Sequence, residues 1–353
     1  MNQKSPFPSR PHSLPPRMAG LSLIELMISI TIGLMILSAV AVVFVNTSAA
    51  RNEIERTSRQ IENGRYAIEL ISDDLRLAGF YGELNIGSVT VPGALPADQC
   101  SLDTDNWNAW IPLHVQGFDN GTGFSQTTCA LTNHKANTDI LLVRRTRTCY
   151  AGTGTPTASY CGDTVSNTTP YMQVSLCASE VTGHKFGVAN RGSVFSADTD
   201  FDRKKKDCST AADKREYYVR IYYISTENGR GQNIPTLKRI ELTSTGWTTV
   251  SLVEGIEEFN VAYGLDTNND GAPDSYSASP AAIGDWLNVV SVQFHVLARN
   301  LETSPDYTDS KTYTLGIDAA NAPVTVTPGG GYRRHVYSSL VRLINPSGRK
   351  DVP

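Results

Sequence analysis

The sequence predicts an α+β protein, in which one long N-terminal helix is followed by an antiparallel β-sheet. From Leu26 to Val45 no residue is charged and none is proline, so this run can cross a bilayer core of ~30 Å as a helix. A helical apolar periodicity continues beyond Val45. From Glu216 onward the pattern changes to the period-two alternation of strands, with short spacings that favour antiparallel pairing.

The apolar run follows a polar, proline-rich segment that ends in Ala19-Gly20. A secretory signal has its small-residue cleavage site after the apolar stretch instead. If a peptidase cuts after Gly20, the apolar helix therefore stays on the mature protein. Basic residues ahead of the run place the N-terminus in the cytoplasm and the rest of the chain outside it. These residues are Lys4, Arg10 and Arg17.

Glu25 lies at the outer edge of the apolar run. A carboxylate at membrane depth costs about 2.5–3.5 kcal/mol, which makes it a functional hypothesis. Cleavage after Gly20 creates an α-amino group at Leu21, and Glu25 of one subunit can pair with that amine on its neighbour. The simpler alternative is a single-pass signal anchor, in which Glu25 has no partner.

The segment Gly20–Leu26 resembles the type IV prepilin signal, which the prepilin peptidase cuts after the glycine. It departs from the family pattern at Leu21, where phenylalanine is most frequent. The resemblance implies cleavage between Gly20 and Leu21, N-methylation of Leu21 and an assembly role for Glu25.

The helix is expected to continue past the membrane, because no proline occurs between Pro16 and Pro92. Its later half is expected to pack on the protein's own globular domain, because the apolar stripe broadens there. A helix from Leu21 to about Ala78 would be about 87 Å long, with Gly79 as its stop. The stripe consists of Ile54, Ile61, Ala67, Ile68, Ile71, Leu75 and Ala78.

The end of this helix resembles that of PilW-type minor pilins, in which a DLRxAGFxG pattern closes the helix. Residues Asp74–Gly82 read DLRLAGFYG. The run Tyr332–Leu343 similarly resembles the closing strand of this subgroup. The resemblance implies a pilin fold, with the long helix packed on the sheet, and does not constrain the middle of the chain.

These features divide the chain into a leader (1–20), a helix that is transmembrane and then amphipathic (21–80), and a globular domain (81–353). The first part of that domain, 81–215, is loop-rich, and only Asp139–Arg147 is predicted there as a strand. The second part, 216–353, is predicted to form the sheet. Its predicted strands are Tyr217–Ile224, Thr236–Thr243, Thr248–Val253, Glu258–Tyr263, Leu287–Ala298, Lys311–Leu315 and Val336–Ile344.

All six cysteines lie beyond the membrane helix, outside the cytoplasm in this topology, where disulfides persist. An even count fits up to three disulfides, and the sequence does not choose among the pairings. A zinc site is the disfavoured alternative, because no CxxC pair occurs and the histidines are scattered. The disulfide candidates are Cys100, Cys129, Cys149, Cys161, Cys177 and Cys208.

The segment 266–274 (DTNNDGAPD) has oxygen ligands at alternate positions and a glycine at the turn, as a calcium loop requires. Ser277 stands where an EF-hand has its bidentate glutamate, and no helix pattern flanks the loop. The alternatives are therefore a structural calcium site and a metal-free hairpin turn; no other cofactor is expected. The calcium ligands would come from Asp266, Asn268, Asp270, the Ala272 carbonyl and Asp274.

The charge and motifs disfavour two further classes of function. Loss of the leader removes three basic residues and changes the net charge from −4 to −7, which argues against general nucleic-acid binding. Basic runs at 144–147, 203–206 and 333–334 are the features that would contact phosphates in a DNA-binding alternative, but such runs are more often solvated. No hydrolase, P-loop, zinc-protease or dinucleotide motif occurs, so no enzyme is expected.

The resemblance implies a minor pilin, made as a single-pass inner-membrane prepilin with its C-terminal domain in the periplasm. The protein would then enter the pilus filament or its tip. Its expected role is type IV pilus assembly in a priming or tip complex. Expected partners are the prepilin peptidase, other minor pilins, the major pilin, the inner-membrane assembly platform and a large tip adhesin. The alternatives are a minor pseudopilin of type II secretion, and a tip adhesin or DNA-uptake receptor that binds through the loops of 81–215.

Overall fold

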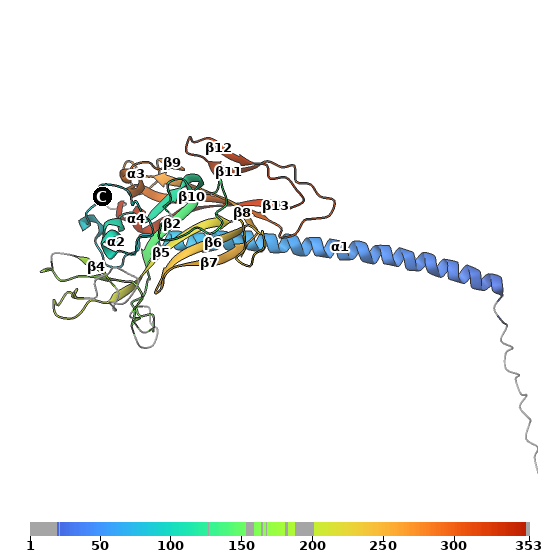
Figure 1. The fold of residues 1–353 in the computed structure, drawn as a ribbon, viewed down its shortest axis with the longest axis horizontal. Coiled ribbons are helices and arrows are strands. Elements are labelled where there is room, and N and C mark those ends of the chain that lie inside the picture. Colours follow the sequence, from blue (N-terminus) through green and yellow to red (C-terminus); the bar gives the residue numbers. More distant parts are fainter. Residues whose placement is uncertain are drawn as a thin grey trace, which may run out of the picture. The chain divides into compact units, whose positions relative to one another are not determined.

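A computed structural model describes residue 20 and residues 22–350, apart from 126, 153–158, 164, 167, 181–182 and 188–200. The described chain is a long helix with antiparallel sheets, which confirms the predicted α+β class and its pilin-like character (Figure 1). It forms two units, residues 1–54 and residues 55–353.

The first unit holds the N-terminal part of helix α1 (Leu23–Arg76, 54 residues). Within the described residues one helix, α1, is long and apolar enough to cross a membrane, and none of its most apolar stretch is buried. Side chains such as Met35 and Phe44 are 69% and 70% exposed. So much exposed apolar surface is unfavourable in water. The length and composition of the helix are compatible with a single membrane pass.

In the second unit, α1 buries one face of its C-terminal part. Ala67, Ile71 and Leu75 are fully buried, whereas Ile61 remains 40% exposed. The prediction that the later half of the apolar stripe packs on the globular domain is therefore confirmed, and its earlier half is not covered. The helix ends at Arg76, followed by a hydrogen-bonded turn through Ala78.

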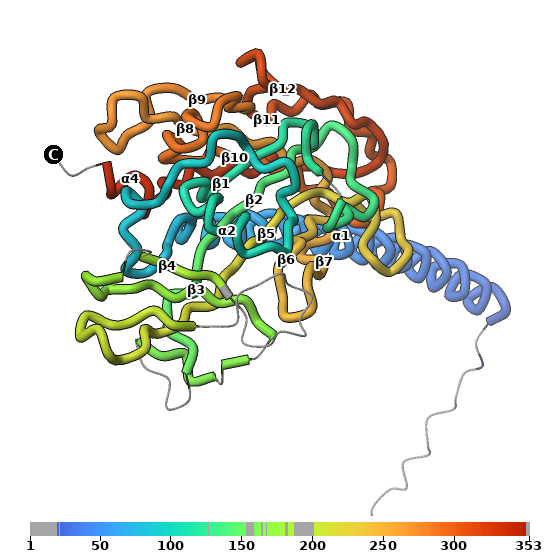
Figure 2. The backbone as a smooth tube through the Cα atoms, turned by 60° about the vertical axis from the view of Figure 1, so that its left-hand side comes forward, coloured from blue at the N-terminus to red at the C-terminus, as the bar shows by residue number. Residues whose placement is uncertain are grey.

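The larger sheet has seven strands in the described part of the chain, all antiparallel to their neighbours. Its main path runs β1-β2-β5-β3-β4, and β6 and β7 extend it from β5 (Figure 2). Their bounds are β1 Val115–Phe118, β2 Ile140–Thr146, β3 Tyr171–Val174, β4 His184–Gly187, β5 Lys214–Ser225, β6 Thr236–Thr243 and β7 Gly246–Glu254.

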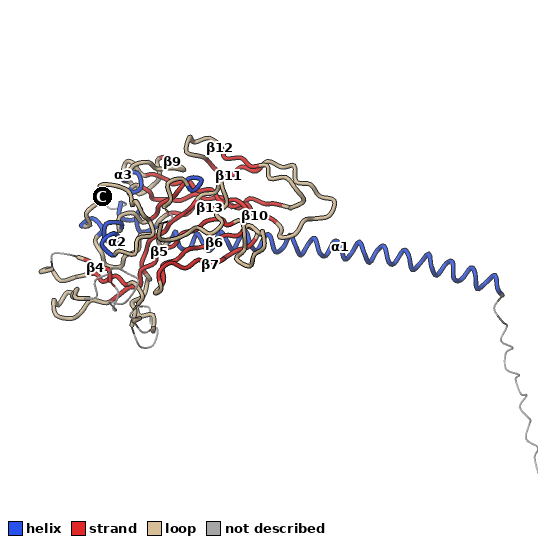
Figure 3. Tube along the Cα trace, viewed as in Figure 1, coloured by secondary structure: helices blue, strands red, loops and turns tan. Residues whose placement is uncertain are grey.

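The second sheet has the order β13-β10-β8-β9, and β11 pairs with β12 separately. Short helices complete the described elements (Figure 3). The strands are β8 Ile256–Leu265, β9 Ser275–Ser277, β10 Val289–Arg299, β11 Tyr313–Ile317, β12 Pro323–Val326 and β13 Arg334–Arg342. The helices are η1 Ile86–Ser88, α2 Thr104–Trp110, η2 Asp119–Gly121, α3 Ile283–Leu287 and α4 Ile344–Lys350.

The buried face of α1 contacts strands of both sheets. The Gln60 side-chain amide donates to the carbonyl of Ala298 in β10 at 2.8 Å, and the Asn63 amide donates to that of Glu254 in β7 at 3.0 Å. These bonds satisfy polar groups that burial would otherwise penalise. Ala67, Ile71 and Leu75 of α1 belong to the hydrophobic core of the globular domain.

The strands predicted in 216–353 all correspond to strands of the structure, whereas 81–215 contains more order than its sequence indicates. Strand β2 lies between β1 and β5, so this region contributes to the larger sheet itself. All seven residues of β2 are buried, including Arg144 and Arg145. The strand predicted at Asp139–Arg147 is confirmed by β2. The strands β1, β3 and β4 and the helix α2 are not predicted, because each has only 4–7 residues and a weak periodic pattern.

The predicted disulfides are confirmed, and the structure decides their pairing. The bonds join Cys100 to Cys129, Cys149 to Cys161 and Cys177 to Cys208, with Cα–Cα distances of 5.7, 5.3 and 4.9 Å. Each cysteine pairs with its neighbour in the sequence, at separations of 29, 12 and 31 residues. Closing these loops reduces the entropy that loop-rich chain loses on folding.

Candidate assembly site

Glu25 caps the beginning of α1. The backbone N–H of Ser22 donates to Glu25 Oε2 at 3.1 Å. This is the reach-back bond of a capping box, in which Ser or Thr is followed three residues later by Glu. A carboxylate is also stabilised at this end of a helix by the helix dipole. Sequence reasoning missed this second role, although the Ser22-x-x-Glu25 spacing carries the signal.

The predicted cleavage site lies just ahead of this cap. Gly20 is exposed, and Leu21 lies outside the described residues. The cleavage after Gly20, the methylation of Leu21 and the pairing of its amine with Glu25 therefore stay predictions.

Hydroxyl groups within the apolar run bond to the helix itself. Ser29, Ser38 and Thr47 donate to carbonyl oxygens one turn earlier at 2.7–2.8 Å, and Thr31 donates to Met27 in the same way. Polar groups in a hydrocarbon environment need such internal partners. These hydroxyls are therefore compatible with an apolar surrounding.

At the other end of α1, Asp74 anchors the helix to the larger sheet. Its Oδ1 accepts bonds from Arg145 Nη2 at 2.8 Å and Arg220 Nη1 at 2.5 Å, and Tyr222 Oη–H donates to its Oδ2. Burial alone raises the pKa of Asp74, but Arg220, Arg145 and the Tyr222 hydroxyl together hold it below its usual value. Asp74 is only 3% exposed, so this carboxylate acts as a buried anchor.

The glycine after the helix has the role that its position predicts. Gly79 has φ +69°, which favours glycine, and its N–H donates to the carbonyl of Arg144 in β2 at 3.0 Å. From α4, the Asn345 amide donates to the Ala78 carbonyl at 3.1 Å, and Arg349 Nη2 donates to the Gly79 carbonyl at 2.6 Å. The DLRLAGFYG segment is thus the junction of α1, β2 and α4.

The 266–274 loop joins the paired strands β8 and β9, as the hairpin alternative predicts. Asp266 is fully buried, and its oxygens accept bonds from the N–H groups of Asn269 and Gly271 at 2.7 and 2.9 Å. Lys350 Nζ lies 3.5 Å from the same carboxylate. Asp274 Oδ2 accepts the Thr267 N–H at 2.7 Å.

Those bonds bear on the calcium alternative, because the carboxylates already have donors. Within the described ranges no group of three or more His, Cys, Asp or Glu side chains is gathered to hold a metal. The calcium ligands Asp266, Asn268, Asp270, Ala272 and Asp274 therefore stay an untested prediction, which the Lys350 ammonium disfavours.

Most side chains of the three basic runs are buried or paired with carboxylates within the described residues. Arg144 and Arg145 are buried, at 0% and 8% exposure. Lys205 pairs with Asp213 at 2.9 Å, and Arg334 pairs with Glu257 at 2.5 Å. Buried or paired charges of this kind are not free to contact phosphates, so these side chains lend no support to the DNA-binding alternative.

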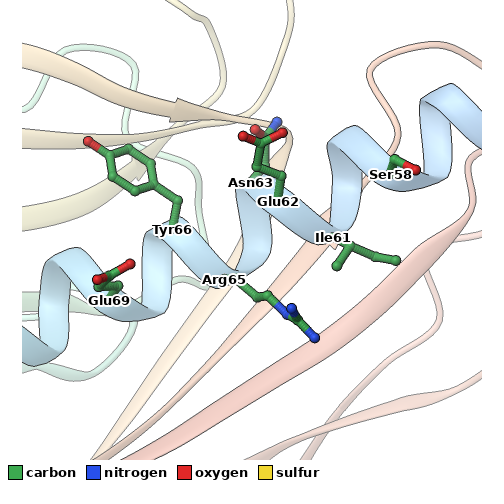
Figure 4. Close-up of a pocket in the computed structure, with 7 residues that line it drawn as sticks. All are labelled: Ser58, Ile61, Glu62, Asn63, Arg65, Tyr66 and Glu69. Carbon is green, nitrogen blue, oxygen red and sulfur yellow. The ribbon is translucent and has the colours of Figure 1, made fainter.

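An exposed recess of about 640 Å³ lies over the outer face of α1 in the second unit. Ile61 and Tyr66 bring apolar surface to it, at 40% and 50% exposure. Arg65 and Ile61 point to one side of the helix and Tyr66 to the other (Figure 4). Of its lining residues only Ile61 belongs to the predicted apolar stripe, so the sequence does not single out this face. Its lining residues are Ser58, Ile61, Glu62, Asn63, Arg65, Tyr66 and Glu69.

Comparison with known proteins identifies the context of this fold. Residues 221–345 match the family model described as type IV pilus-assembly protein W. The match runs from β5 to the beginning of α4 and includes the whole second sheet. No curated protein and no solved structure matches the chain. The chain is thus a type IV pilus-related protein, and the matched domain indicates involvement in pilus assembly.

Proposed function

We propose that this protein is a minor pilin that joins type IV pilus assembly through α1, in a priming or tip complex. The observation that carries the proposal is an unburied apolar helix with a carboxylate at its start, on a chain with the pilus-assembly match. The role is one of assembly, without catalysis. The partners are the prepilin peptidase, the other pilins, the inner-membrane platform and a large tip adhesin.

In this proposal the exposed apolar part of α1 is covered in turn by two different environments. Apolar surface gains about 25 cal/mol per Å² when it leaves water, and the described chain covers none of the most apolar stretch of α1. In the proposal a bilayer covers this surface first, with the globular domain in the periplasm. The packed helices of the filament then replace the lipid.

Processing is the first step to be tested. We expect cleavage between Gly20 and Leu21 and methylation of the new amine at Leu21, detected by mass spectrometry of the mature N-terminus. A Gly20→Val variant is expected to accumulate as an uncut precursor. A wild-type protein that keeps residues 1–20 in the assembled fraction would contradict the proposal.

Glu25 can be tested apart from its capping role. Glutamine still accepts the Ser22 N–H but has no charge to pair with an amine. We therefore expect both Glu25→Gln and Glu25→Ala to insert in the membrane and fail to assemble. The measurement is the amount of the variant in sheared pili against the membrane fraction. Normal assembly of Glu25→Gln would show that the charge is not needed.

A minor pseudopilin of type II secretion is the nearest rival, and the match to a pilus-assembly family favours the pilus. A deletion strain separates the two by its phenotype. We expect loss of surface pili and twitching with normal secretion of exoproteins. Normal piliation with lost secretion would favour the rival. Normal piliation with lost surface or DNA binding would favour a tip adhesin or uptake receptor.

A further inference from the structure

Strand β13 is an open edge of the second sheet. It pairs with β10 over all of Arg334–Arg342, and no strand in the described part of the chain lies on its other side. An open edge presents a row of backbone N–H and C=O groups that can pair with another strand. Leu340 of β13, a large apolar side chain, is 61% exposed.

Helix α1 runs beside this strand and leaves a groove. Two recesses, of about 340 and 370 Å³, lie between them and share Arg65 and Tyr337. The first is bordered by β13 from Arg333 to Tyr337, by α1 and by the loop that holds Tyr307 and Lys311. The second continues along Ser338 and Ser339. We call these two adjoining recesses the α1–β13 groove.

The first recess is strongly basic. Its lining includes Arg65, Lys311 and Arg333 and no carboxylate residue. Arg334 also borders it, but Glu257 and Asp309 neutralise its charge at 2.5 and 2.9 Å. Neither Arg65 nor Lys311 forms an ion pair within the described residues. The whole chain has a net charge of −4, so an acid-free cluster of this kind is a local exception.

Apolar and aromatic groups lie between these charges. Ile61 is 40% exposed, and the Arg333 guanidinium stacks over the Tyr307 ring at 4.4 Å. The Tyr337 hydroxyl is buried without a hydrogen-bond partner. The first recess therefore offers apolar contact and positive charge beside the open edge of β13, whereas the second is lined by both Glu69 and Arg76.

We propose that the α1–β13 groove binds an extended acidic peptide segment of a partner protein, which adds to β13 as a further strand. Backbone bonds to the open edge supply affinity, and side-chain contacts supply specificity. Carboxylates on alternate residues would face Arg65 and Lys311, and complementary charge favours that partner over others. Nucleic acid also carries negative charge, but it has no backbone amides to pair with a strand.

The proposal concerns a surface separate from Glu25, so it is tested by binding and not by pilus assembly. The full chain in detergent micelles is titrated into a fluorescein-labelled decapeptide of alternating Glu and Val, and anisotropy is measured. We expect saturable binding that weakens with added salt. The matching Lys-Val peptide is expected not to bind. Equal binding of both peptides, or tighter binding of a single-stranded oligonucleotide, would overturn the proposal.

Charge-reversal variants test the residues. We expect Arg65→Glu and Lys311→Glu each to raise the Kd for the Glu-Val peptide about tenfold. Arg230→Glu makes the same charge change at an exposed site in the turn between β5 and β6, and less than a twofold change is expected there. The Arg65→Glu, Lys311→Glu double variant should gain binding to the Lys-Val peptide, which an unfolded variant would not do. No difference from Arg230→Glu would overturn the assignment.

N-methylation of the peptide backbone tests whether the peptide adds to β13 as a strand. In an added strand only alternate N–H groups point toward β13. Two Glu-Val peptides are compared, N-methylated either at the Glu or at the Val positions. We expect one to lose binding and the other to retain it within about threefold. Retention by both peptides, or loss by both, would overturn addition to the edge.

Discussion

The aromatic ring of Tyr337 lies directly against the backbone of Gly64, and a Cβ added to Gly64 would come within 2.2 Å of Tyr337 Cε2. Further along the same interface, Ser72 Oγ and Ser339 Oγ lie 3.4 Å apart. Small residues on this face of α1 therefore allow β13 to approach closely.

Gly64→Ala is predicted to destabilise the globular domain. Overpacking costs about 1–3 kcal/mol, and the higher helix propensity of alanine offsets up to about 1 kcal/mol. A net loss of about 1–2 kcal/mol is expected in urea unfolding of the full chain in detergent. Gly33→Ala is the matched control in the same helix, because a Cβ added there meets no described atom within 4 Å outside the neighbouring helix backbone. A Gly64→Ala variant as stable as Gly33→Ala would contradict the close packing.

Asp74→Asn is predicted to be severely destabilising. It leaves Arg145 and Arg220 beside the helix end without their anion, and breaking a buried ion pair costs about 3–5 kcal/mol. Asp73→Asn is the control, because the ion pair of Asp73 with Arg76 is exposed and worth about 1 kcal/mol or less. Tryptophan fluorescence during denaturation measures both. Equal effects at the two positions would show that the Asp74 cluster does not anchor α1.

The buried His114 is predicted to make stability depend on pH. Burial lowers its pKa to about 4, from about 6.5 in an exposed chain. Between these values the unfolded state binds more protons, so the free energy of unfolding falls as pH falls from 6.5 toward 4.

At pH 5 the contribution of His114 amounts to a loss of about 2 kcal/mol relative to pH 8. His114→Gln is expected to remove that part of the pH dependence, whereas His335→Gln, at an exposed site, should retain it. Unfolding curves at pH 5 and pH 8 give the comparison. A wild-type curve with the same pH dependence as His114→Gln would contradict a neutral buried imidazole.

The disulfide between Cys100 and Cys129 is predicted to contribute more stability than that between Cys149 and Cys161. It closes a 29-residue separation against 12, and both of its cysteines are buried. Replacing both by alanine is expected to cost about 3–4 kcal/mol. Replacing Cys149 and Cys161, which close the shorter loop, should lower the free energy of unfolding by about 1 kcal/mol less. The reverse order of melting temperatures would contradict this ranking.

Local patterns account for much of the fold. The strands after Glu216 alternate with period two, and the apolar stripe of α1 repeats with the helix, because one face of each element is buried. The cap at Glu25 is also a local feature, indicated by the Ser22-x-x-Glu25 spacing. Short strands such as β3 and β4 carry too few residues for a period to appear.

The sequence by itself determined the exposed apolar helix, the antiparallel strands of 216–353, the glycine that ends α1 and the oxidised state of the cysteines. Each of these follows from residue type or from the pattern of neighbouring residues. Only the tertiary structure decided the disulfide pairing, the Asp74 anchor and the groove at Arg65. Those features join residues that are distant in the chain, and no local pattern records which buried charges or strand edges will meet.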